Sequence, residues 1–171
     1  LHHPIAYAAQ RLSHVNSTWR LGVPPRWPNA TPPQSTEPND IGLDAPGRVA
    51  LAWQKMADAW VDLPIMWPVV WLLLAAGGLA VTRGAGMAGA LFASTLGQEA
   101  SFLVISVASD FRYHLWAIIA CALGLVLARP WRGDRRIVGV TVAVLVVVLI
   151  VGIATRAMLP IPPQSYQGML G

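Results

Sequence analysis

The segment "IVGVTVAVLVVVLIVGIAT", residues 137–155, contains no charged residue and is rich in Val and Ile. In water such β-branched residues favour a buried strand, but strands seldom exceed about ten residues. An α-helix that crosses the ~30 Å core of a bilayer needs about 20 apolar residues. The length of this segment therefore predicts a transmembrane helix.

Three further apolar runs precede it, at residues 67–82, 87–108 and 113–128. Each approaches the length of a membrane span. The run from residue 113 is the shortest, so we expect it to take "DFRYH", residues 110–114, into its first turn. The sequence thus predicts an all-α integral membrane protein with about four transmembrane helices between residues 64 and 159.

The composition agrees with a membrane protein. Of the 171 residues, 55% are hydrophobic, and the mean hydropathy of +0.52 exceeds that of ordinary soluble domains. The net charge is +4, but the basic residues are scattered or lie beside apolar runs, which is typical of loops that set membrane topology. The sequence contains no stripe of basic residues of the kind that binds nucleic acid. Cys121 is the only cysteine, so an internal disulfide and a thiolate metal site are excluded, and we predict no metal and no cofactor.

Four arginines lie in the connection "RPWRGDRR", residues 129–136, which we predict to be cytoplasmic. Alternation of the spans then places residues 1–63 and the tail 160–171 on the outward, periplasmic side of a bacterial inner membrane. Arg48 and Lys55 oppose this orientation, because they lie near the first span on the outward side.

The outward segment is predicted to contain two amphipathic helices and a loop. Residues 47–62 place four large side chains on one helical face, Val49, Trp53, Met56 and Trp60. This face suits either the headgroup boundary of a membrane or contact with protein, and the sequence leaves both open. Residues 3–16 carry a weaker apolar stripe with Pro4 in the first turn. Residues 22–40 contain too many prolines for a helix or a central strand.

The second apolar run has two different faces. Small residues recur every four positions and would let another helix approach closely in lipid: Ala85, Gly89, Ala93, Gly97 and Ser101. On the opposite face lies Glu99, an intramembrane acid, for which the insertion cost of a central Asp, about 2.5–3.5 kcal/mol, is a guide. Glu99 is therefore expected to face protein or a polar cavity. It is either a proton-relay or substrate-contacting acid, or a protonated, hydrogen-bonded structural residue.

The hairpin "SDFRYH", residues 109–114, also has two interpretations. In the structural one, Asp110 caps the third helix, Arg112 extends to the headgroups and Tyr113 belongs to the aromatic belt. In the functional one, Arg112, His114 and Asp110 form a contact for a lipid phosphate or a substrate at the membrane surface.

Two stretches resemble a known group of proteins: "HPIAYAAQRLSHVNSTWRL", residues 3–21, and "GQEASFLVISVASDFRYHLW", residues 97–116. They are similar to the C-terminal part of bacterial polytopic membrane proteins. Those proteins resemble the GT-C class of membrane glycosyltransferases, which take sugars from polyprenyl-phosphate carriers. The resemblance extends over residues 1 to about 130. The positions that match its motifs are His3, Pro4, Tyr7, Arg11 and His14, and Glu99, Ser109, Asp110, Phe111, Arg112 and Tyr113.

The resemblance implies that the chain is the C-terminal piece of a longer protein, as its start at Leu1 also suggests. The GT-C class keeps its catalytic acid in the first outward loop, so this piece would contain no catalytic residue and be inactive alone. It would supply scaffold and, through Arg112, a contact to a polyprenyl-phosphate carrier. Its partners would be membrane lipids and the N-terminal part of the same chain. Two other functions stay open: a non-catalytic membrane anchor or assembly module, and a fragment of a proton-coupled transporter in which Glu99 titrates.

Overall fold

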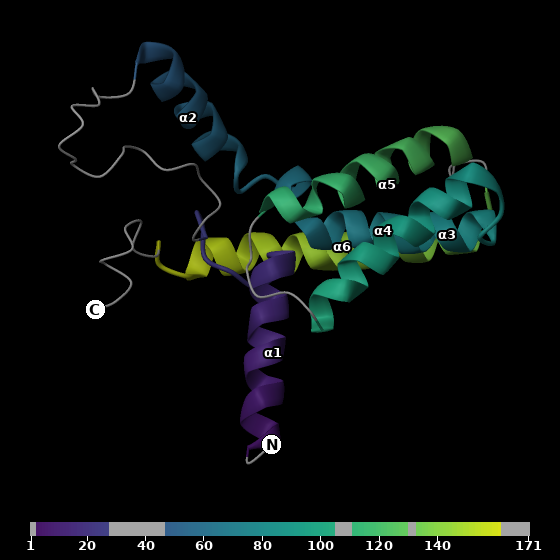
Figure 1. Ribbon diagram of the computed structural model, residues 1–171, viewed down its shortest axis with the longest axis horizontal. Helices are drawn as coiled ribbons and strands as arrows, with labels where there is room; N and C mark the ends of the chain where they lie inside the picture. The colour runs from purple at the N-terminus through teal and green to yellow at the C-terminus, as the bar shows by residue number, and fades with distance from the viewer. Residues whose placement is uncertain (1–2, 28–46, 105–110, 130–132, 162–171) are drawn as a thin grey trace.

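A computed structural model describes residues 3–27, 47–104, 111–129 and 133–161, and every regular element in these ranges is helical (Figure 1). The predicted all-α class is confirmed for this part of the chain. Most of the Pro-rich loop, Ser109, Asp110 and the tail from residue 162 lie outside the described residues. The elements are α1 (Pro4–Trp19), α2 (Arg48–Trp60), the 3-10 helix η1 (Pro64–Met66), α3 (Pro68–Thr82), α4 (Gly86–Val104), the 3-10 helix η2 (Phe111–His114), α5 (Leu115–Ala128) and α6 (Arg135–Met158).

Local sequence signals explain where the bundle helices begin and end. Pro68 occupies the first turn of α3, where its missing N–H costs nothing. Asp134 caps α6, because its carboxylate accepts the backbone N–H of Arg136 at 2.8 Å. α3 and α5 end at Arg83 and Arg129, which adopt left-handed backbone conformations.

Two helices are long and apolar enough to be candidate membrane spans: Phe111–Ala128, which joins η2 to α5, and Arg135–Met158. At 1.5 Å per residue, the 24 residues of α6 extend about 36 Å, more than a bilayer core requires. The 15 residues of α3 extend only about 22 Å. The structure therefore supports two candidate spans, and about four spans stays a prediction.

The core of the bundle forms around one aromatic ring. Phe92 of α4 is fully buried, and glycines on both neighbouring helices make room for it. A Cβ atom added at Gly78 of α3 would lie 2.3 Å from the Phe92 ring, and one at Gly124 of α5 would lie 2.7 Å from it. This contact holds α4 between α3 and α5 and so determines which face of α4 points inward.

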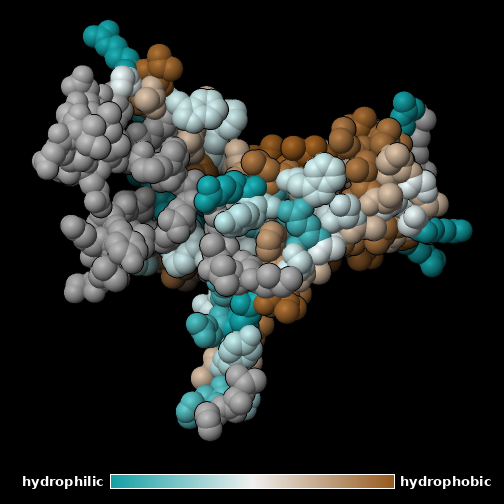
Figure 2. Space-filling view, viewed as in Figure 1, coloured by the Kyte–Doolittle hydropathy of each residue, from teal (hydrophilic) through white to brown (hydrophobic). Residues whose placement is uncertain are grey.

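The bundle has two different ends (Figure 1). α1, α2, η2 and the last turn of α6 lie at one end, while the α3–α4 turn and the start of α6 lie at the other. α1 leaves the bundle instead of running along it. In Figure 2, hydrophobic side chains cover the α5 side of the bundle, and hydrophilic ones gather on α1 and at the end that contains the α3–α4 turn.

Candidate functional site

Two polar side chains from neighbouring helices meet inside the bundle. Oε1 of Glu99, on α4, lies 2.7 Å from Nδ1 of His114, at the start of α5. Both residues are about 1% exposed. Glu99 thus faces protein, as the sequence predicts. The pairing with His114 was not predicted, because one interpretation of the hairpin placed this histidine beside a surface phosphate or substrate and the other gave it no role.

The residues one turn away along α4 enclose this pair. Thr95 is buried, and its hydroxyl donates to the backbone carbonyl of Ala117 on α5 at 3.1 Å. Phe102 presents its ring edge-on to His114, with 4.9 Å between the ring centroids. These contacts fix the rotation of α4 against α5, so the carboxyl group and the imidazole are held at hydrogen-bonding distance.

A carboxyl group and an imidazole at this distance can share one proton, and the pair then has no net charge whichever partner holds it. This neutrality lowers the cost of burying Glu99. Its second oxygen, Oε2, is also buried and has no hydrogen-bond partner among the described residues. Among the described residues, the pair therefore keeps one buried acceptor atom without a donor.

The predicted phosphate-contact residues are placed differently from one another. Arg112 is exposed, with its guanidinium carbon 5.6 Å from the centroid of the Tyr113 ring. His114, two residues later, points into the bundle. Asp110 lies outside the described residues. Of the three, Arg112 is thus the one whose described position suits a group arriving at the surface.

The small-residue stripe of α4 faces mainly outward. Ala93 and Gly97 are exposed, and a Cβ atom at Gly97 would meet nothing within 4 Å. Gly89 is buried, but its hypothetical Cβ atom would lie 2.4 Å from the backbone of Gly84 in the preceding turn, not from another helix. Ser101 is half-buried. Close contact with a further helix along this stripe stays a prediction.

The motif residues of α1 share one surface. Tyr7, Arg11 and His14 line a polar cleft of about 570 Å³ together with Gln10, Ser13, Ser17 and Trp27. The guanidinium of Arg11 also donates to the backbone carbonyls of Phe102 and Leu103. These carbonyls belong to the last turn of α4, where a cation is favourable. Arg11 therefore attaches α1 to the end of α4.

A second buried cluster, which the sequence did not reveal, lies at the same end of the bundle. It comprises Arg20, Asp62, Trp67 and Arg156. The guanidinium carbon of Arg156 lies 3.9 Å from the centroid of the fully buried Trp67 ring, a cation–π contact. Nε of Arg156 lies 3.6 Å from Oδ1 of Asp62.

The two arginines of this cluster connect three distant segments. Nη2 of Arg156 donates to the backbone carbonyl of Arg20 at 2.9 Å. Nη1 of Arg20 donates to the carbonyl of Met66 at 3.3 Å. Burial, followed by the charge of Arg156, lowers the pKa of Arg20 to about 10, while Asp62 acts in the opposite direction. Arg20 therefore remains charged at neutral pH.

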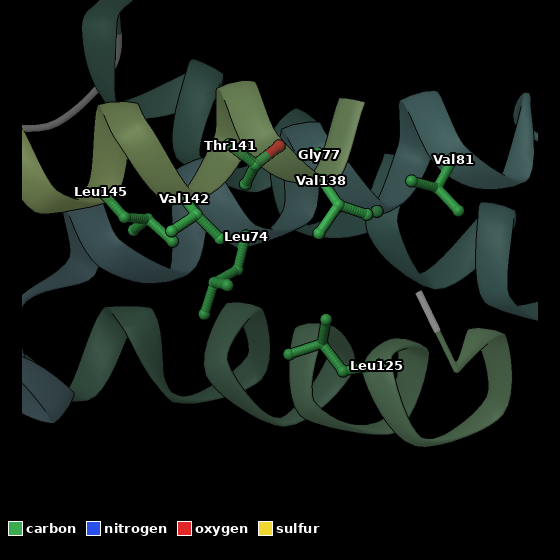
Figure 3. Close-up of a pocket in the computed structure, with 9 residues that line it drawn as sticks. Leu74, Gly77, Val81, Leu125, Val138, Thr141, Val142 and Leu145 are labelled. Atoms are coloured by element: carbon green, nitrogen blue, oxygen red, sulfur yellow. The ribbon is translucent and has the colours of Figure 1, made fainter. Parts of the chain in front are cut away.

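Figure 3 shows a separate cavity of about 270 Å³ between α3, α5 and α6. Leu125 of α5 faces Val138, Val142 and Leu145 of α6 across it. The hydroxyl of Thr141 is already bonded to a carbonyl of its own helix at 2.9 Å. The lining is thus almost entirely apolar. It suits an apolar ligand chain and offers no polar group for catalysis.

Of the resemblance motif residues that the structure describes, Tyr7, Arg11 and His14 line the cleft of α1, Glu99 lies on α4, and Phe111, Arg112 and Tyr113 belong to η2. In the ranges that the structure covers, no three His, Cys, Asp or Glu side chains gather where they could hold a metal ion. The function is therefore inferred from the geometry of the chain itself. In comparisons with known proteins, no family model, no curated protein and no solved structure matches it.

Proposed function

We propose that the chain is a membrane-embedded helical scaffold of about four spans, which forms the C-terminal membrane region of a polytopic, glycosyltransferase-like protein of the bacterial inner membrane. The observation that carries this proposal is the distribution of side chains in the bundle, with polar ones inside and large apolar ones on the surface. Glu99, His114 and Thr95 are buried, while large apolar side chains on α5 and α6 are at least half exposed, among them Ile119, Leu123, Val126, Val140, Val147 and Ile150. In water this surface would be a large exposed apolar patch, whereas lipid tails match it.

Two further observations support α3 and α4 as spans. The pairing of Glu99 with His114 reduces the charge cost that would otherwise oppose membrane insertion of α4. The α3–α4 turn, which contains Arg83, and the start of α6 at Arg135 lie together at one end of the bundle, as the distribution of arginines in inner-membrane proteins favours.

The span number can be tested with cysteines introduced at three exposed arginines, Arg26, Arg83 and Arg135, and an impermeant maleimide applied to sealed membranes. The native Cys121 is buried and should stay unlabelled. Four spans require Arg83→Cys and Arg135→Cys to react from the same side, opposite to Arg26→Cys. If Arg83→Cys instead reacts together with Arg26→Cys, only α5 and α6 cross the membrane and the four-span proposal fails.

Within this scaffold, Arg112 is proposed to contact the phosphate of a polyprenyl carrier. Its exposure, and its position at the end of the bundle where headgroups would lie, support this role. In the full-length protein, Arg112→Ala is expected to lower use of a polyprenyl-phosphate donor, whereas Arg135→Ala, an exposed arginine at the other end, should not. Unchanged turnover and apparent donor affinity in Arg112→Ala would remove the assigned role.

The buried Glu99–His114 pair favours a second candidate function, proton transfer in a transporter fragment. Glu99→Gln keeps a polar side chain of nearly the same shape but cannot titrate. Proton-coupled flux through the full-length protein should then be lost, with the protein still folded. Flux that is unaffected by Glu99→Gln would eliminate this alternative.

A further inference from the structure

A pocket of about 260 Å³ lies at the end of the bundle where α2, η1 and η2 meet. Its lining combines one charged residue with seven apolar ones. The apolar residues are Trp53, Met56, Ala57, Trp60, Val61, Met66 and Phe111, and the charged one is Arg20.

Arg20 is only 4% exposed, yet much of its hydrogen-bonding capacity is unused. A guanidinium has five N–H donors. Nη1 reaches the carbonyl of Met66, but Nε and Nη2 are buried and have no acceptor in the described part of the chain. Buried donors without acceptors are rare in folded proteins, and a bound ion is one of the recognised explanations.

Among the described residues, the positive charges close to Arg20 outnumber the negative ones. Arg156 adds a second buried positive charge, and the carboxylate that faces the two arginines among the described residues is that of Asp62. This carboxylate is already engaged, because it lies 3.6 Å from Nε of Arg156 and also accepts the backbone N–H of Arg26 at 3.1 Å. Among the described residues, the two guanidinium groups of Arg20 and Arg156 thus share a single carboxylate beside the pocket.

We propose that this pocket binds the phosphate head group of an anionic phospholipid of the surrounding bilayer. Because Nε and Nη2 of Arg20 have almost no accessible surface, the side chain would turn its guanidinium toward the pocket and donate to the phosphate oxygens, whose geometry it suits. The start of the lipid chain would lie along Trp53 and Trp60, whose rings are at least half exposed and continue the apolar lining outward. A free phosphate ion would gain nothing from that lining.

This inference rests on the proposed membrane location, but it concerns a residue different from Arg112. It also assigns a role to the exposed apolar face of α2. Charged arginine and amphipathic tryptophan side chains are both suited to the headgroup level of a bilayer.

The test uses the full chain in nanodiscs of phosphatidylcholine into which phosphatidylglycerol is titrated, with retained lipid counted by native mass spectrometry. Phosphatidylglycerol should be retained in preference to phosphatidylcholine. Arg20→Gln should weaken this retention about tenfold or more, as expected for loss of a charge-assisted hydrogen bond. Arg48→Gln, which removes an exposed arginine on α2, is the matched control and should change it less than about twofold, the size of a weak surface-charge effect.

A second variant covers the case in which Arg20→Gln does not fold. Ala57→Trp fills the pocket from the α2 side and should also abolish the preference. Equal retention of the two lipids by the unmodified chain, or unchanged preference in a folded Arg20→Gln or Ala57→Trp variant, would overturn the proposal. Displacement of the lipid by inorganic phosphate at equal concentration would overturn the lipid assignment in favour of the free anion. In each case the cysteine accessibility result for the spans stands independently.

Discussion

Replacing Gly152 by alanine should destabilise the protein, although the same change within a helix usually stabilises it. Gly152 lies in α6 against the Trp67 ring, and a Cβ atom there would be 2.4 Å from the nearest ring carbon. The ring cannot easily move away, because it is fully buried and carries the guanidinium of Arg156 at 3.9 Å on its face. The added methyl group must therefore displace Trp67 or separate α6 from the start of α3.

The size of the effect follows from a comparison within the same helix. Gly139 also lies in α6, but a Cβ atom there would meet nothing within 4 Å. Both substitutions gain the helix propensity of alanine over glycine, about 0.8–1 kcal/mol. This contribution cancels in the difference between the two variants, which leaves the cost of overfilling a packed site, about 1–3 kcal/mol.

Thermal unfolding of the detergent-solubilised chain, followed by circular dichroism, would measure this difference. At about 2–4 °C per kcal/mol for a chain of this length, Gly152→Ala should unfold about 2–12 °C below Gly139→Ala. If the two variants unfold at the same temperature, or Gly152→Ala at the higher one, the contact between α6 and Trp67 is not the close one described.

Three further outcomes are expected. Glu99→Ala leaves His114 buried without its hydrogen-bond partner, which should cost about 1–3 kcal/mol of stability; a loss below about 1 kcal/mol in chemical denaturation would contradict the buried pair. Gly89→Ala should destabilise α4, because the new methyl group meets the backbone of the preceding turn, whereas Gly97→Ala should be neutral or slightly stabilising; the reverse order in thermal unfolding would argue against this placement. Cys121 is buried and should react with a maleimide only after denaturation, so rapid labelling of the folded chain would show that α5 is not enclosed as described.

The helices could be predicted from the sequence because their signals are local. The apolar runs of helical length give the bounds of α3 to within one residue and those of α6 to within three residues. The rotation of each helix about its axis is not a local property. The small residues of α4 were expected to mark its contact face, but the room for close approach is supplied by Gly78 and Gly124 on the neighbouring helices, which receive Phe92.

The candidate site was predictable only in part for the same reason. Glu99 could be singled out because a charge within an apolar run is costly. Its partner could not, since His114 belongs to the short 3-10 turn whose winding directs the ring inward. The cluster of Arg20 and Arg156 joins residues 136 positions apart, and no local pattern links them. An arginine at the end of a long apolar helix is the one local signal, and it does not identify the residues that Arg156 contacts.

The bond from Arg156 to the carbonyl of Arg20 also has a consequence for biosynthesis. A chain emerges from the ribosome in order, and its early segments begin to fold first. Here the end of α1 and the residues around Met66 receive partners from the last turn of α6, which is made only after α3, α4 and α5. The end of α1 must therefore stay partly assembled until α6 has been made, and a ribosome that stopped before Arg156 would release a chain in which Arg20 and Trp67 lack these partners.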